Sequence, residues 1–287
     1  FYPNPLASNG KYSRKPWFGC ACCPSNVSRF IPSLPGYVYA VKDNQVYVNL
    51  YLSNKAELII NKKKVVLEQE TGYPWNGDIR VKVAQGNQEF ALKLRIPGWV
   101  RNEVLPSDLY SYADNQKPTY RIIVNGQETA NTLNNGYLSI ERKWKKGDVV
   151  KIHFDMLPRI VKANEKVVDD KGRVSVERGP IVYCAEWPDN KCNVHTVLLN
   201  QHPQFKVVEK PELLYGISQL KTDAQALSYD KNGKLITKDT ELTLIPYYAW
   251  AHRGEGDMEV WLPIDVSAAS ALPQEVQKWE DNGFFKN

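Results

Sequence analysis

The chain has 287 residues, of which 43% are hydrophobic and 24% charged, a composition typical of a globular protein large enough for two domains. The formal net charge is +5, but the basic residues are scattered along the chain, which argues against a nucleic-acid partner. No apolar run approaches the roughly 18–20 residues that a membrane helix needs, so we expect no membrane partner.

Residues 1 to about 36 show little strand pattern, and no basic-then-apolar leader precedes them, so we expect that processing or truncation removed what came before. Pro24 is a favoured first residue of a helix, and apolar residues at helical spacing follow it. This pattern predicts a short helix that stops at Pro35 and Gly36. The apolar residues of its face are Val27, Phe30, Ile31 and Leu34.

From Tyr37 onward the apolar period changes to two, with turn residues such as Asn125 and Gly126 between the alternating runs. Many short strands at regular spacing are typical of a β-sandwich or jelly roll. The predicted strands are 46–52, 56–60, 64–70, 78–83, 89–96, 120–124, 137–144 and 149–154.

A second all-β region begins near Asp155, and we expect an extended tail over residues 267–287, which are polar and weakly patterned. Its predicted strands are 159–163, 174–177, 181–186, 197–199, 205–208, 235–237, 241–245 and 258–262. The eight Trp and sixteen Tyr of the chain suit β structure and also suit sugar binding, although packing is the commoner use of aromatic residues.

Three of the five cysteines crowd together at Cys20, Cys22 and Cys23. Adjacent cysteines rarely bond to each other, so the cluster favours metal binding or nucleophilic chemistry over a disulfide framework. The thiolate is the reactive form of cysteine, and both a helix N-terminus and a bound Zn²⁺ stabilise it. The alternative is that these are small residues buried in a tight turn, and the residues alone leave both interpretations open.

A tetrahedral zinc site needs four ligands, and outside the cluster at Cys20, Cys22 and Cys23 the sequence has no Cys-x-x-Cys pair. The four histidines, none at ligand spacing to the cysteines, are expected to be surface or packing residues: His153, His195, His202 and His252. The more distant cysteines, Cys184 and Cys192, are open to bridging in an oxidising compartment, but a buried thiol is favoured for Cys184.

The run from Trp17 to Asn26, with Cys22-Cys23-Pro24 at its centre, resembles the signature of glycoside hydrolase family 127, which includes β-L-arabinofuranosidases. Other segments resemble further motifs of the same family, so that the resemblance covers essentially the whole chain. These segments are residues 1–6, 47–51, 69–75, 94–99, 178–184 and 245–254.

The resemblance implies an (α/α)6 barrel followed by two β-sandwich domains. We therefore expect a mainly β chain in which two jelly-roll-like β-sandwich domains follow the last segment of the barrel. Residues 1–38 would be the end of the catalytic barrel with its cysteine loop, 39–154 the middle β-sandwich domain, and 155–287 the C-terminal β-sandwich domain.

The resemblance also implies a mechanism. Cys22 would be the nucleophile, forming a thioglycosyl intermediate that water opens with retention, which differs from the common pair of carboxylates. Cys22 and Cys23 would both bind Zn²⁺, and Tyr2 would lie in the substrate pocket, while Cys20 would be structural. The substrate would be β-L-arabinofuranose, or a related sugar, at the non-reducing end of a plant-type glycan.

The family's other zinc ligands and its glutamate acid/base belong to the part of the barrel that precedes this segment. Glu103, Glu128 and Glu141 match no catalytic position. We therefore expect this chain alone to be inactive and the N-terminal barrel segment to be its partner, together with a glycan substrate.

Two other functions stay open: a non-catalytic carbohydrate-binding module, and a β-sandwich module that only supports the barrel. The segment from Trp250 to Arg253 suggests either a ligand pocket or, as we prefer, a turn in the core or an interdomain contact. The sequence does not fix the compartment, although we favour the periplasm or secretion over the cytoplasm.

Overall fold

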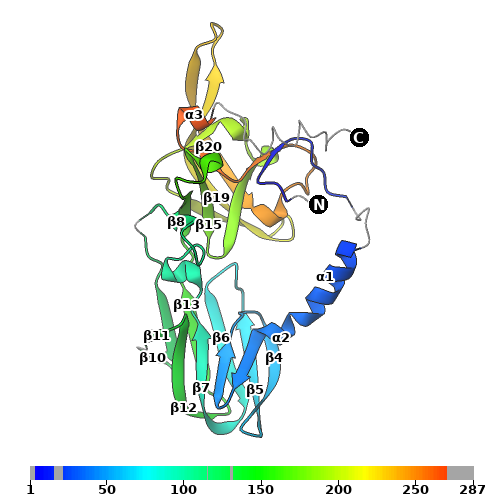
Figure 1. Cartoon of the computed structure of the whole chain (residues 1–287), viewed down its shortest axis with the longest axis vertical. Helices are drawn as coiled ribbons and strands as arrows, with labels where there is room; N and C mark the ends of the chain where they lie inside the picture. The colour runs from blue at the N-terminus through cyan, green and yellow to red at the C-terminus, as the bar shows by residue number, and fades with distance from the viewer. Residues whose placement is uncertain (1–3, 16–21, 115, 130–131, 270–287) are drawn as a thin grey trace. The chain divides into compact units, whose positions relative to one another are not determined.

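The computed structural model describes residues 4–15, 22–114, 116–129 and 132–269, and these are mainly β (Figure 1). They divide into two compact units. The C-terminal unit contains the described parts of 1–17, 104–116 and 157–287, and the middle unit those of 18–103 and 117–156. Within the described residues no helix is long and apolar enough to cross a membrane. The expected mainly β class with β-sandwich domains is confirmed.

The middle unit begins with two helices and continues as a sandwich of a six-stranded and a five-stranded sheet. The strand order is β10-β9-β13-β6-β5-β4 in the first sheet and β11-β12-β7-β3-β2 in the second. The elements are α1 (Cys22–Ser33), α2 (Pro35–Val38), β2 (Tyr39–Lys42), β3 (Gln45–Val48), β4 (Asn54–Ile60), β5 (Lys63–Thr71), β6 (Asp78–Gln85), β7 (Asn87–Arg95), β9 (Tyr120–Val124), β10 (Gln127–Glu128), β11 (Leu133–Asn134), β12 (Tyr137–Lys145) and β13 (Val149–Phe154).

Alternation along the strands builds the core of this sandwich. In β13, Val150, Ile152 and Phe154 are buried while the residues between them face outward, because successive side chains of a strand point to opposite faces. Trp144 is fully buried on β12, and its indole N–H donates to the carbonyl of Phe90 at 3.0 Å. The predicted turn at Asn125 is confirmed, since it and the following glycine have positive φ, as a two-residue hairpin turn requires.

The C-terminal unit is built on one branched sheet of eleven strands, with the order β17-β19-β20-β16-β15-β14-β8 along its main path. Off this path, β18 pairs with β19, β22 with β15, and β21 with both β16 and β1. The elements are β1 (Ala7–Asn9), β8 (Tyr110–Tyr112), β14 (Pro158–Ala163), β15 (Arg173–Arg178), β16 (Ile181–Glu186), β17 (Val197–Leu199), β18 (Lys206–Lys210), β19 (Ile217–Tyr229), β20 (Leu235–Pro246), β21 (Asp257–Glu259), β22 (Leu262–Pro263) and α3 (Val266–Ala269).

The N-terminal segment 4–15 is part of the C-terminal unit, although we expected it to end the barrel. Strand β1 pairs with β21 in antiparallel register, and Tyr12 packs edge-on against Trp250 in the core, with ring centroids 5.9 Å apart. Residues 22–38 belong to the middle unit, and the assignment of residues 1–38 to the end of the barrel stays a prediction. The expected boundary at 154 lies close to the observed change of unit between residues 156 and 157.

Four expected strands end early, join or divide in the structure. The run 46–52 ends as a strand at Val48, where the pairing of β3 with β7 stops. Residues 235–237 and 241–245 join into the single strand β20, because β19 pairs with it along its length. The expected strand 258–262 is divided between β21 and β22.

Candidate functional site

Cys22 is the first residue of α1, so the predicted position of the cysteine pair at a helix N-terminus is confirmed. Cys22 is exposed, Cys23 is half-buried, and their sulfurs lie 3.9 Å apart. The hydroxyl of Ser25 donates to the carbonyl of Cys22 at 2.9 Å within the first turn. The N–H groups at the start of a helix and the helix dipole favour an anionic group, which suits a thiolate.

The spacing of the two sulfurs fits a shared zinc ion. Zinc binds thiolate sulfur at about 2.3 Å, and two ligands of a tetrahedral ion at that distance lie about 3.8 Å apart. The observed 3.9 Å between Cys22 Sγ and Cys23 Sγ is close to this value. Within the described residues no group of three or more His, Cys, Asp or Glu side chains could hold a metal ion. The described residues therefore bring two sulfurs together but contain no complete set of zinc ligands.

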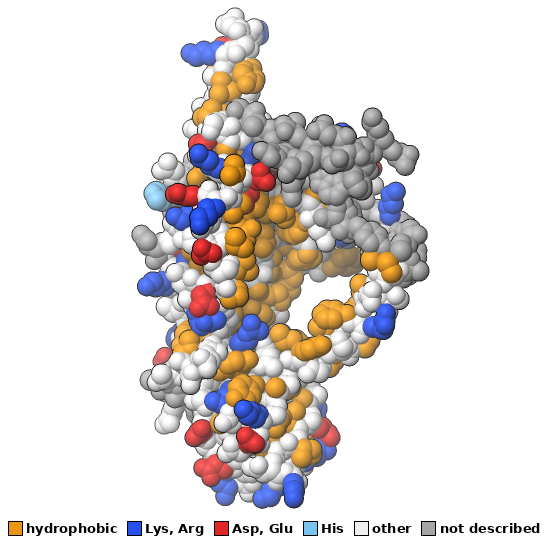
Figure 2. Space-filling view, viewed as in Figure 1, with side chains coloured by type: hydrophobic (Ala, Val, Ile, Leu, Met, Phe, Trp, Pro, Cys, Tyr) orange, Lys and Arg blue, Asp and Glu red, His pale blue; other side chains and the backbone are white. Residues whose placement is uncertain are grey.

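Helix α1 buries none of its residues. The three apolar residues predicted to form one face, Val27, Phe30 and Ile31, are each at least half exposed, and Figure 2 shows uncovered hydrophobic side chains along this helix. The fourth, Leu34, lies just beyond the end of α1. The helical pattern is therefore confirmed, but its apolar face has no partner among the described residues.

The other residues of the predicted site region are only partly described. Tyr2 and Cys20 lie outside the described residues, so their predicted roles remain predictions. The segment that follows Tyr2 is held by the C-terminal unit: the hydroxyl of Tyr247 donates to the carbonyl of Pro5 at 2.9 Å. Farther along, the guanidinium of Arg14 donates to the carbonyl of Trp250 at 2.8 Å.

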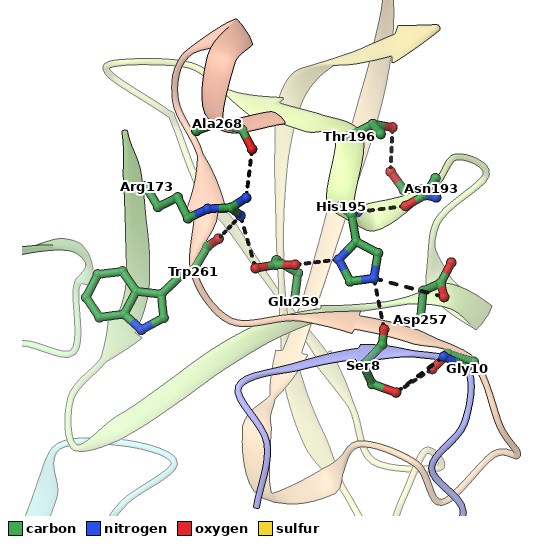
Figure 3. Close-up of polar contacts among 11 residues, drawn as sticks. Ser8, Gly10, Arg173, Asn193, His195, Thr196, Asp257, Glu259, Trp261 and Ala268 are labelled. Atoms are coloured by element: carbon green, nitrogen blue, oxygen red, sulfur yellow. Dashed lines mark hydrogen bonds and ion pairs between the residues drawn. The ribbon is translucent and has the colours of Figure 1, made fainter. Parts of the chain in front are cut away.

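A buried charged network lies beside strand β1, and Figure 3 shows its contacts. His195, in a short helical turn (Val194–Thr196), is 3% exposed, Glu259 of β21 is 1% exposed, and Arg173 of β15 is 7% exposed. One ring nitrogen of His195, Nδ1, contacts Glu259 Oε2, and the other, Nε2, lies 2.9 Å from the carbonyl oxygen of Ser8. Arg173 Nη1 donates to Glu259 Oε1 at 3.2 Å and to the carbonyl of Trp261 at 3.0 Å.

The electrostatics of this network favour a charged histidine. Burial lowers the pKa of His195. The hydrogen bond and the charge of Glu259, together with the charge of Asp257, raise the pKa by more than burial lowers it, so that it lies above the ordinary value. Our sequence-based interpretation of His195 as a surface or packing residue did not include its contacts with Glu259 and Ser8. No local signal marks it, because Ser8 and Glu259 are 187 and 64 residues away in the chain.

The segment from Trp250 to Arg253 forms a second charged cluster and a core turn, not a ligand pocket. Trp250 is buried. The guanidinium of Arg253 binds the buried carboxylate of Glu186, and it donates to the carboxylate of Asp189 at 2.8 Å. Glu186 also accepts from the main-chain N–H of Ala251 at 2.6 Å. The preferred interpretation as a turn in the core is confirmed within the C-terminal unit.

The remaining candidates offer no reactive centre. Cys184 is a fully buried free thiol, as favoured, and burial raises its pKa; Cys192 is also a free thiol. His202 and His252 are exposed, and His153 contacts Asp78 at 2.7 Å on the outer face of the middle sandwich. The glutamates that match no catalytic position are all exposed: Glu103, Glu128 and Glu141.

The chain matches two family models over most of its length. Residues 45–156 match the "Beta-L-arabinofuranosidase, GH127 middle domain", and residues 158–263 match the "Glycoside hydrolase family 127 C-terminal domain". The boundary between the two matches agrees with the change of unit near residue 156.

Named relatives agree with these models. The chain is 30% identical over 268 residues to a "Non-reducing end beta-L-arabinofuranosidase" of Bifidobacterium longum subsp. longum, a match that covers 86% of this chain and 38% of the relative. A solved structure described as a GH127 β-arabinofuranosidase is 82% identical, with a TM-score of 0.91, over 93% of this chain and 42% of that one. A GH127 β-L-arabinofuranosidase from Geobacillus stearothermophilus T6 is 33% identical, with a TM-score of 0.76, over 88% of this chain and 38% of that one.

The chain thus spans about two fifths of the length of the relatives it matches. Both family models, the sequence identities and the fold agree on the same assignment. The chain belongs to glycoside hydrolase family 127 and carries the middle and C-terminal domains of that family.

Proposed function

We propose that this chain is the C-terminal part of a retaining glycoside hydrolase that releases β-L-arabinofuranose, or a related sugar, from plant-type glycans. The observation that carries the proposal is a cysteine pair at the start of α1, with Cys22 exposed, in a chain of family 127. The named activities of the relatives support the sugar. These relatives are named as arabinofuranosidases, which supports a glycan as the substrate.

In the proposed mechanism Cys22 is the nucleophile. Its thiolate sulfur attacks the anomeric carbon, the bond from that carbon to the leaving oxygen breaks, and the leaving oxygen takes a proton from a general acid. Water then attacks the same carbon, the carbon–sulfur bond breaks, and the thiolate is restored while water loses its proton to the same acid/base group. Two displacements at one carbon retain its configuration.

Cys22 and Cys23 would hold Zn²⁺, as their sulfur spacing allows. When bound, zinc would keep the thiol of Cys22 deprotonated at neutral pH. We propose that the remaining ligands, the general acid and most of the sugar pocket come from the barrel of the longer enzyme, with Tyr2 added by this chain. The uncovered apolar face of α1 supports this, since such a face is suited to packing against other helices.

The experiment is an assay of a chromogenic aryl β-L-arabinofuranoside with two proteins: this chain alone, and the enzyme with its barrel. We expect turnover only from the longer protein, loss of turnover in Cys22→Ser, and a mass increase of one anhydropentose on the peptide that contains Cys22 after denaturation during turnover. Turnover by Cys22→Ser at the parent rate would contradict the role of Cys22. Turnover by the chain alone at the rate of the longer enzyme would contradict the proposal that the barrel supplies the general acid and the remaining zinc ligands.

A supporting role for the C-terminal β-sandwich is the second function that the structure favours. This unit binds residues 4–15 through strand pairing, through Tyr247 and through the core contact of Tyr12. Four of the six described tryptophans are buried, so most of these side chains are used in packing and are not available to stack on sugars: Trp99, Trp144, Trp250 and Trp261. A sugar-binding module is the less favoured alternative, and calorimetric titration with arabino-oligosaccharides would distinguish the two.

A further inference from the structure

A hollow of about 430 Å³ lies on the outer face of the six-stranded sheet of the middle unit, and we call it the basic hollow. It lies over the adjacent strands β6, β13 and β9, with one residue of β5 at its side. Successive side chains of a strand alternate between core and solvent, so the outward-facing residues of these strands line it. The charged and ionisable residues of the lining are Glu70, Asp78, Arg80, Arg121, Lys151 and His153.

The register of the strands brings basic residues together in the basic hollow. Lys151 of β13 lies directly across from Arg80 of β6, and Arg121 of β9 lies directly across from His153 of β13. Residues at such positions have Cβ atoms about 4.5–5.5 Å apart, and like charges there destabilise a sheet. Arg121 and Lys151 are diagonal neighbours, about 7–8 Å apart. Three positive charges are thus concentrated on three adjacent strands at a cost in stability.

Two of these cations have no acidic partner in the chain as the structure describes it. Arg121 and Lys151 are exposed and form no ion pair with any described residue. Nearby on the same face, the ammonium groups of Lys55 and Lys82 lie 3.2 and 3.7 Å from carboxylate oxygens of Glu68. Cations that crowd together without partners depart from this pattern, and such departures are expected at functional sites. The arrangement is suited to an anionic ligand.

The basic hollow also offers hydrogen-bond acceptors. Arg80 contacts the carboxylate of Glu70 at 2.9 Å, and His153 contacts that of Asp78 at 2.7 Å. Both carboxylates are exposed, and a carboxylate has about four acceptor positions, so each can accept further hydrogen bonds. A ligand that fits this lining has a negative charge for the cations and donors for the carboxylates. A uronate sugar has both, in its carboxylate and its hydroxyl groups.

Nucleic acid fits this lining less well. Single-stranded nucleic acid is bound by aromatic side chains on which the bases stack, and the described lining contains no Trp, Tyr or Phe. A phosphate group at neutral pH has no donor for Glu70 or Asp78, and their negative charges would repel it. A sugar that carries a single carboxylate beside several hydroxyl groups meets neither difficulty.

We propose that the basic hollow binds an acidic saccharide: Arg121 and Lys151 contact a uronate carboxylate, and Glu70 and Asp78 accept from its hydroxyl groups. The preference for a saccharide rests on the proposed function, in which the substrate is a glycan. The preference for an acidic one rests on the charges of the lining alone. The middle unit would thereby hold a uronate-containing part of the glycan.

The first experiment measures binding to this chain and needs no enzymatic activity. Calorimetric titration compares tetragalacturonate with arabinotetraose, a neutral saccharide of the same number of sugars, and with a single-stranded oligonucleotide of the same charge. We expect tetragalacturonate to bind with a Kd below about 1 mM at low salt, and at least about tenfold more weakly in about 0.5 M salt, because salt screens exposed charges.

Three outcomes would overturn the proposal. The absence of tetragalacturonate binding would exclude the site. Equal affinity for arabinotetraose would show that the charges do not select the ligand. Tighter binding of the oligonucleotide would assign the basic hollow to nucleic acid.

Variants locate the binding to the basic hollow. Arg121→Ala and Lys151→Ala should each raise the Kd for tetragalacturonate about tenfold, the equivalent of one charge-assisted hydrogen bond. The matched control is Lys143→Ala, since Lys143 is exposed on β12 in the other sheet, and it should leave the Kd unchanged. An unchanged Kd in both Arg121→Ala and Lys151→Ala would place the ligand elsewhere and overturn the proposal.

A charge reversal separates binding from folding. Lys151→Glu puts a carboxylate directly opposite Arg80, so it should abolish binding while the urea midpoint of the middle unit stays equal or rises. A lower midpoint would contradict the claim that opposed cations destabilise this sheet. Binding that persists in Lys151→Glu would contradict the role of Lys151.

The second experiment measures catalysis in the enzyme that carries the barrel. Its substrates are two arabinofuranosyl oligosaccharides that differ only in whether a neighbouring sugar is a uronate. We expect Arg121→Ala to reduce the ratio of kcat/KM for the acidic over the neutral substrate about tenfold, and Lys143→Ala to leave this ratio unchanged. An unchanged ratio in Arg121→Ala would refute a role of the basic hollow in substrate choice. If the parent hydrolyses neither substrate, the proposed function fails, while the titrations still decide whether the basic hollow binds acidic saccharides.

Discussion

Glu186 provides the sharpest test of how the C-terminal unit is held together. Its carboxylate is 1% exposed and accepts from two donors, the main-chain N–H of Ala251 at 2.6 Å and the guanidinium of Arg253. Glu186→Ala would leave a buried N–H without an acceptor and would remove one of the two carboxylates that neutralise Arg253. We therefore predict a large loss of stability in this unit.

The contacts set the magnitude. An unsatisfied buried N–H costs about 1–3 kcal/mol, and breaking a buried ion pair costs about 3–5 kcal/mol. Arg253 is partly exposed and keeps Asp189 at 2.8 Å, so the lower end of the second range applies. We expect Glu186→Ala to lower the free energy of unfolding by about 4–6 kcal/mol, and Glu186→Gln, which retains an acceptor, by about 1–2 kcal/mol.

The assay is urea unfolding monitored by hydrogen exchange and mass spectrometry on peptides of β16 and residues 247–253, because two compact units need not unfold together. The matched control is Glu70→Ala, which breaks an exposed ion pair with Arg80 of 2.9 Å and should cost about 0–1 kcal/mol. Equal effects of Glu186→Ala and Glu70→Ala would refute the reasoning, since the predicted difference rests on the burial of Glu186 and of the N–H that it accepts from.

Three further predictions address the other parts of the chain. Cys22→Ser should leave the urea midpoint of this chain unchanged, because Cys22 is exposed, and should lower the zinc content of the barrel-containing enzyme measured by mass spectrometry. Leu94→Ala, at a fully buried position, should lower the unfolding free energy of the middle unit by about 2–5 kcal/mol. Ile59→Ala, at a position 63% exposed, should change it by less than about 0.5 kcal/mol. Equal changes for the two variants in urea titrations would contradict this prediction. Burial raises the pKa of Glu177 despite its hydrogen bond from Tyr112. The parent should therefore lose stability relative to Glu177→Gln as the pH rises from about 4.3, the ordinary pKa of a glutamate, through the raised pKa. A difference in unfolding free energy that does not change with pH would contradict this prediction.

The middle sandwich was largely predictable from alternation. Strands β9 and β13 have the predicted bounds, residue for residue, and the turn after β9 lies at the predicted Asn125. A strand with one face in a core and the other toward solvent repeats every two residues in sequence, so a local pattern is sufficient to locate it. The position of Cys22 at a helix start was predictable for a similar reason, because Pro24 and the apolar spacing behind it are local signals.

Strand β19 shows where this reasoning stops. It is 13 residues long, yet it was not predicted. Its first four residues are all buried, including the polar Ser218 and Gln219, so the alternation that marks a strand is absent there. Its length is decided by pairing with β20 on one side and with β17 and β18 on the other.

The sequence alone determined the mainly β class, most strands of the middle unit and the cysteine pair at a helix start, because each depends on residues close together in the chain. Only the tertiary structure decided that residues 4–15 join the C-terminal sheet and that His195 lies buried between Ser8 and Glu259. A buried charge is stable only beside its partners, and these partners come from opposite ends of the chain, where no local pattern can associate them.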